Sequence, residues 1–86
     1  MVIFAITRSG YLELAAIIKS AMYPVWVSEG VLACSEIDLL RKSGVELTNF
    51  TYEISPCDKD AIESALEVIV LHHPGERIWV ECLPQI

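Results

Sequence analysis

The chain has 86 residues, 53% of them hydrophobic, and carries 12 acidic against 6 basic side chains, for a formal net charge of −6. This size suits one domain over residues 1–86, and the acidic balance with scattered cations disfavours nucleic acid as a partner. Its apolar runs are far shorter than the roughly 18 residues of a spanning helix, and no signal-peptide pattern opens the chain, so we expect a cytoplasmic protein without membrane contact.

The first quarter of the chain predicts a strand, a helix and a second strand. Residues 2–7 form a continuous apolar, β-branched run typical of a strand that is buried on both faces. Residues 11–22 then follow a helical period, with Ser9 as the expected cap and Pro24 beyond the end. Residues 25–27 predict a short strand that ends at the turn 28–30.

The middle of the chain predicts a short helix and a strand. A capping box is expected at Ser35, with the carboxylate of Asp38 three residues later, and Gly44 closes the helix. Residues 45–54 alternate imperfectly, which predicts a loop or bulge near residues 48–49 followed by strand.

The last third contains the clearest helical pattern of the sequence. Apolar residues recur at helical spacing from Ala61 to Val70, and either Ser55 or Asp58 can cap this helix. His72 and His73 follow, as is typical of a helix C-terminus. Residues 77–83 predict a final strand.

The predicted order βαβαβαβ indicates an α/β fold with a four-stranded, mainly parallel sheet and about three helices. We expect the first strand to be central, the strand order to be 2-1-3-4, and the last helix to pack through Ile62, Leu66 and Ile69. That order places Trp26 and Trp79 on the two edge strands. Edge strands with exposed aromatic side chains favour contact with another chain.

The turn after the first strand is the best candidate for a ligand site, because it supplies hydroxyls, a cation and a flexible backbone at a helix start. Ligands of open parallel sheets bind beyond the carboxyl ends of the strands, which adds the turn after the second strand. The predicted ligand-binding residues are Thr7, Arg8, Ser9, Gly10, Ser28 and Glu29. Neither turn carries the glycine spacing of a dinucleotide or P-loop motif.

No catalytic residue, metal site or cofactor is predicted. The first strand ends in Thr7 rather than in an acidic residue, so a magnesium site built from Glu29, Asp58 or Glu81 is disfavoured. His72 and His73 are adjacent and would point about 100° apart on a helix, so a metal site with Glu76 is disfavoured.

The odd number of cysteines favours a reducing compartment over a disulfide framework. We expect Cys34 and Cys82 to be small buried hydrophobes, and Cys57, at a helix start, is the one candidate for a reactive thiol.

The sequence therefore favours a small, acidic, non-enzymatic interaction module that binds itself or a protein partner. High apolar content in so short a chain is the main reason, because a small domain cannot bury all of it. The alternative is a small-ligand or nucleotide-binding domain that uses the turn after the first strand.

Overall fold

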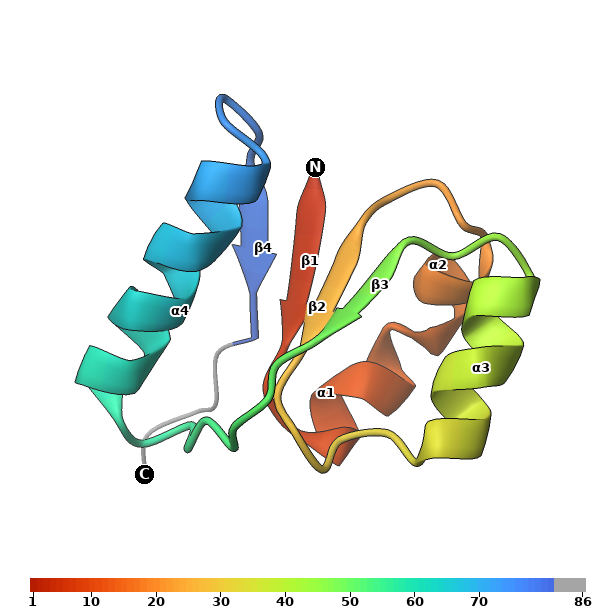
Figure 1. Ribbon diagram of the computed structural model, residues 1–86, viewed down its shortest axis with the longest axis horizontal. Coiled ribbons are helices and arrows are strands. Elements are labelled where there is room, and N and C mark those ends of the chain that lie inside the picture. Colours follow the sequence, from red (N-terminus) through yellow and green to blue (C-terminus); the bar gives the residue numbers. More distant parts are fainter. Residues whose placement is uncertain (82–86) are drawn as a thin grey trace.

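The computed structural model describes residues 1–81, in which four strands and four helices alternate (Figure 1). The strands are β1 (Val2–Ala5), β2 (Val25–Val27), β3 (Leu47–Asn49) and β4 (Ile78–Val80). The helices are α1 (Arg8–Glu13), α2 (Ala15–Lys19), α3 (Cys34–Lys42) and α4 (Lys59–His72). Every strand pairing is parallel, which confirms the predicted α/β fold.

The strands lie side by side in the order β3-β2-β1-β4. β1 is central and fully buried, as predicted, but the expected order 2-1-3-4 is wrong. β3 is the most polar strand and pairs with its chain neighbour β2 at one edge, so β2 is interior. β4 crosses to the other side of β1, with Ile3 opposite Trp79.

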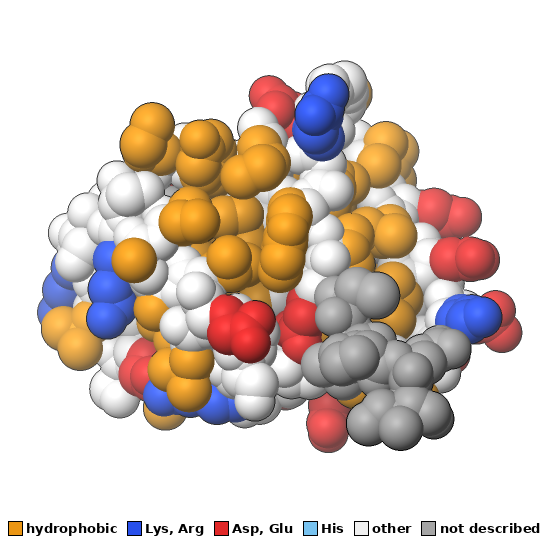
Figure 2. Space-filling model, turned by 180° about the vertical axis from the view of Figure 1, so that it is seen from behind, with side chains coloured by type: hydrophobic (Ala, Val, Ile, Leu, Met, Phe, Trp, Pro, Cys, Tyr) orange, Lys and Arg blue, Asp and Glu red, His pale blue; other side chains and the backbone are white. Residues whose placement is uncertain are grey.

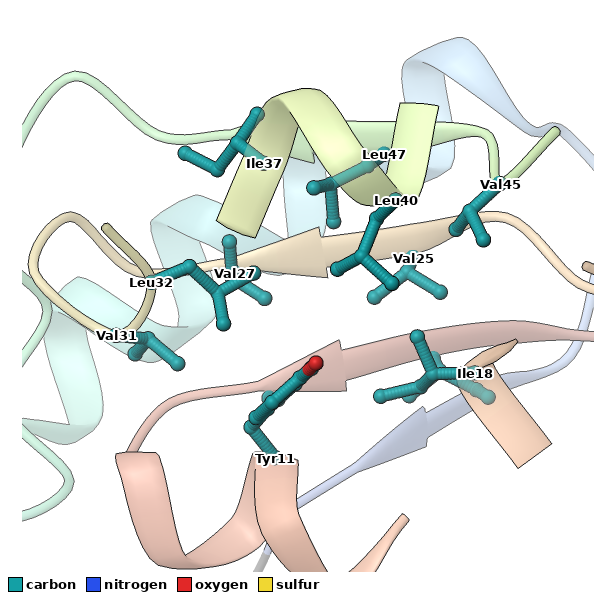
Figure 3. Close-up of a cluster of buried hydrophobic side chains, with 12 residues drawn as sticks. Tyr11, Ile18, Val25, Val27, Val31, Leu32, Ile37, Leu40, Val45 and Leu47 are labelled. Carbon is teal, nitrogen blue, oxygen red and sulfur yellow. The ribbon is translucent and has the colours of Figure 1, made fainter. Parts of the chain in front are cut away.

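Helices cover both faces of the sheet, with α1, α2 and α3 on one side and α4 on the other (Figure 1). On the three-helix side, Tyr11, Ile18 and Leu40 pack on alternate residues of the strands (Figure 3). On the opposite side, Ala65 and Ile69 of α4 pack on the remaining strand residues, with Ile62 and Leu66 beside them. The predicted packing of the last helix is confirmed.

Aromatic side chains fill the core beneath α4. Trp26 is only 5% exposed, and its ring lies 5.3 Å from that of Phe50, centroid to centroid. The expectation that Trp26 lies at an edge of the sheet is therefore wrong, because β2 has a neighbour on each side. Trp79, by contrast, lies on the edge strand β4 and is 39% exposed.

The first helical segment starts earlier than predicted and breaks in the middle. Thr7, not Ser9, is the cap, and its hydroxyl oxygen accepts a hydrogen bond from the backbone of Gly10 at 3.2 Å. Leu14 leaves helical geometry and separates α1 from α2. The hydroxyl residues Thr7 and Ser9 both precede the apolar helical pattern, so the sequence alone does not distinguish which of them is the cap.

Helix α3 also starts one residue earlier than the predicted cap. Ala33 occupies the cap position, and the Glu36 carboxylate accepts a hydrogen bond from its backbone at 3.1 Å. Ser35 is therefore inside the helix, and the box proposed between Ser35 and Asp38 is wrong. Cys34, expected to be buried, is exposed because it lies on the first turn of this helix.

The remaining elements differ from the prediction mainly in length. A loop or bulge was expected near residues 48–49, but these residues belong to β3, and residues 50–54, expected to be strand, are not strand. Asp58 caps α4, since its carboxylate accepts a hydrogen bond from the backbone of Ala61 at 3.1 Å. Of the predicted final strand, residues 78–80 are strand, while Cys82 lies outside the described residues.

Candidate functional site

The carboxyl ends of β1 and β4 lie side by side at the point where the chain switches faces of the sheet. The segment after β1 continues into α1 on one face, whereas β4 follows α4 on the other. Parallel α/β sheets bind their ligands at such a switch point, because the two connections diverge there and leave a crevice. A functional site is therefore expected at this crevice.

The side chain of Glu81, the residue after β4, fills this crevice. One carboxylate oxygen, Oε1, accepts hydrogen bonds from the backbone N–H groups of Ile6 and Thr7, both at 2.8 Å. The other, Oε2, accepts a hydrogen bond from the Thr7 hydroxyl. Glu81 is only 8% exposed, so these donors replace most of its water.

Gly10 lies directly against the Glu81 carboxylate. A Cβ at this position would be 2.0 Å from Oε1 and 2.2 Å from Cδ of Glu81, far inside van der Waals contact. Gly10 therefore provides room for the carboxylate, and its own N–H is satisfied by the Thr7 hydroxyl. The turn after β1 holds an anion, and that anion belongs to the chain itself.

Arg8 points away from this crevice, toward α3. Its guanidinium donates hydrogen bonds to Glu36 at 2.7 Å and to the carbonyl of Val31 at 3.1 Å. The ion pair lowers the pKa of Glu36 and raises that of Arg8, chiefly through the hydrogen bond they share. Within residues 1–81 the only other ion pair joins the N-terminal amine to Glu76, so Glu81 has no cationic partner there.

A cleft of about 270 Å³ opens beside the crevice, between the turns that follow β1 and β2. Thr7, Arg8, Ser28 and Glu29 line it, together with residues of the segment 53–56. Four of the six predicted ligand-binding residues are thus brought together. Ser9 is exposed on α1, and Gly10 is packed against Glu81.

Ser28 fixes the floor of this cleft. It is 1% exposed, and its hydroxyl oxygen accepts a hydrogen bond from the backbone of Ile54 at 2.7 Å. The neighbouring Glu29 carboxylate accepts a hydrogen bond from the Asn49 side chain at 2.7 Å. The Ser28 contact ties the end of β2 to the segment before α4, and the Glu29 contact ties it to the end of β3. The charged residues that line the cleft are Arg8, Glu29 and Glu53, and apolar residues line the rest of it beside the hydroxyls.

Comparison of the chain with models of known families, with curated proteins and with solved structures finds no match.

The histidines and cysteines singled out in the sequence do not come together in one cluster within residues 1–81. No group of three or more metal-ligating side chains occurs within residues 1–81. His72 and His73 end α4, as predicted, and both rings lie against Trp26. Cys57 is exposed on the loop before α4 and makes no disulfide with the described part of the chain. Its reactivity stays a prediction.

Apolar side chains also remain exposed at the surface. Seen from behind the view of Figure 1, they gather across the middle of the molecule (Figure 2). Met1, Ile17 and Met22 line one shallow hollow of about 440 Å³. Trp79 points to the face of the sheet that carries α1 and α2, because its register partner Ile3 packs under these helices. No helix in residues 1–81 is long and apolar enough to cross a membrane.

Glu81 is the residue that sequence reasoning missed as part of the site. It was considered only as a magnesium ligand, and the expected strand order did not place the last strand beside the first. The available signal was its position at the end of an apolar strand, where parallel sheets concentrate their polar groups.

Proposed function

We propose that this protein is a small, acidic, cytoplasmic interaction module whose partner is a second copy of the same chain. The observation that carries the proposal is Trp79, a large aromatic side chain left 39% exposed on an edge strand. Interfaces are enriched in such residues, since one side chain supplies a large apolar contact with little loss of rotamer freedom.

The surroundings of Trp79 support this proposal. Strand β4 contains no charged residue, and the apolar hollow around Ile17 and Met22 lies on the same face of the sheet. A chain of 86 residues with a net charge of −6 repels its own copies at long range, so the contact has to be apolar and local. The β4 side of the molecule meets that requirement.

The oligomeric state tests the proposal directly. Sedimentation across a hundredfold concentration range should show a monomer–dimer equilibrium for the wild-type chain. Trp79→Glu should be monomeric, whereas Leu39→Glu, which adds the same charge at an exposed leucine on α3, should associate as the wild type does. A wild-type chain that remains monomeric throughout would refute the proposal, as would a Trp79→Glu variant that associates normally.

A second candidate function is binding of a small ligand in the cleft between Arg8 and Glu29. The convergence of two polar turns on one cleft favours it. Because Glu81 already occupies the backbone donors of Ile6 and Thr7, an anionic ligand would have to rely on Arg8, which is paired with Glu36. Titration with phosphate or a nucleotide, followed by the amide shifts of residues 7–10 and 28–31, tests this candidate; unchanged shifts at millimolar ligand would refute it.

A further inference from the structure

Within residues 1–81 no strand pairs with the outer edge of β4, and this edge has a defined set of backbone groups. The N–H of Val2 donates to the carbonyl of Arg77 at 2.7 Å, and the N–H of Glu81 donates to the carbonyl of Phe4 at 3.1 Å. Alternate residues of a strand bond the same neighbour, so Trp79 also bonds β1. The N–H and C=O groups of Ile78 and Val80 therefore point to the open side.

This arrangement is complementary to itself. If two β4 strands pair antiparallel about a two-fold axis at Trp79, Ile78 of each copy lies opposite Val80 of the other. Both residues point their backbone groups outward, so each such pair can exchange two hydrogen bonds. The two Trp79 residues then form a non-hydrogen-bonded pair with Cα atoms about 4.5 Å apart, the arrangement that brings side chains closest.

The side chains that flank the edge agree with this register. It places Arg77 of one copy opposite Glu81 of the other. The Glu81 carboxylate stays in the crevice, bonded to Ile6 and Thr7 of its own chain, so no ion pair with Arg77 is counted in favour of the register. The register brings no like charges directly opposite each other beside the axis, where they would be destabilising.

Helix α4 contributes to the same side of the molecule. The β3–α4–β4 connection is a right-handed crossover, and α4 runs antiparallel to the strands (Figure 1). Leu66 directly follows the buried Ala65, and Val70 directly follows the buried Ile69. With this direction of α4, both side chains are turned toward β4, and they line an apolar hollow of about 450 Å³. Val70 is 49% exposed, so α4 leaves an apolar stripe facing the edge.

We propose that two copies of this chain join their β4 edges antiparallel, with Trp79 on the two-fold axis, to form one continuous sheet. The inference rests on the proposed self-association and specifies its geometry. The two indole rings meet on the face that carries α1 and α2, and the Leu66–Val70 stripes of the two α4 helices face each other on the opposite side.

Amide hydrogen exchange tests this geometry without any substitution. Above the dissociation constant measured by sedimentation, the amides of Ile78 and Val80 should exchange slowly, and dilution below it should accelerate them by about tenfold or more, because their hydrogen bonds open with the dimer. The amide of Glu81 bonds β1 within one chain and is the internal control, since its protection should not depend on concentration in the same way.

Disulfide trapping supplies a second measurement. In a background in which Cys34, Cys57 and Cys82 are serine, Trp79→Cys should form a disulfide-linked dimer on mild oxidation, because a Cα separation of about 4.5 Å permits the bond. Leu39→Cys, 64% exposed on α3, should not.

The outcomes separate the two proposals. A chain that is monomeric by sedimentation refutes self-association itself. A dimer in which the amides of Ile78 and Val80 exchange equally fast at high and low concentration, and in which Trp79→Cys is not trapped, refutes the β4 register while self-association stands.

Discussion

Replacing Gly10 by alanine should destabilise the protein strongly, although the same change inside a helix ordinarily stabilises by about 1 kcal/mol. The new methyl group would be 2.0 Å from Oε1 of Glu81, so the carboxylate has to leave the crevice. Its hydrogen bonds from Ile6 and Thr7 are then lost.

The size of the effect follows from these two bonds. Hydrogen bonds to a charged acceptor contribute about 1.5–3 kcal/mol each, so their loss costs about 3–6 kcal/mol, or about 2–5 kcal/mol after the helical gain. A domain of this length has a total free energy of unfolding of about 4–13 kcal/mol. Gly10→Ala should therefore remove a large share of the stability.

Urea unfolding followed by circular dichroism measures this loss, at one low protein concentration because association adds stability. Ser9→Ala, at the preceding exposed helical position, is the control and should change the free energy of unfolding by less than about 0.5 kcal/mol. In a Glu81→Ala background the new methyl group meets no carboxylate, so adding Gly10→Ala should be neutral or stabilising. Equal costs of Gly10→Ala in both backgrounds would refute the reasoning.

Three further variants test other contacts. Ser28→Ala should lower the free energy of unfolding by about 1–3 kcal/mol, because the buried N–H of Ile54 loses its acceptor, and urea unfolding would detect this. Asp58→Ala should cost about 1 kcal/mol through loss of the α4 cap; an unchanged urea midpoint would contradict that role. Arg8 lowers the pKa of Glu36, so the stabilisation from this pair is complete above the ordinary carboxyl pKa and is lost as pH falls through the lowered value. Arg8→Ala should therefore flatten the acid limb of stability against pH, and an unchanged limb would exclude this pair as a contributor.

The fold class could be predicted because hydrophobic periodicity alternates cleanly along the chain. The buried run at residues 2–5 and the helical spacing from Ala61 to Ile69 leave little choice of element type. Strand order could not be predicted in the same way, since short apolar strands such as residues 25–27 and 78–80 look alike. Tertiary contacts alone place one inside the sheet and the other at its edge.

The sequence could likewise indicate only some residues of the candidate site. Thr7 and Ser28 were recognisable because each follows a strand, and parallel strands bring their ends to one side of the sheet. The role of Glu81 depends on which strand neighbours β1, and that information is carried by the packing of α4 across the sheet. Local sequence around residue 81 does not contain it.

The neighbouring strands β1 and β4 are far apart in the sequence. The hydrogen bond between Ile6 and Glu81 joins residues 75 positions apart, so nearly the whole described chain has to leave the ribosome before it can form. Until then, one edge of β1, the most apolar strand, is unpaired, and the backbone N–H groups of Ile6 and Thr7 lack the Glu81 acceptor. Completion of the sheet is thus a late, non-local step, and an unfinished chain presents an aggregation-prone edge that the finished protein covers.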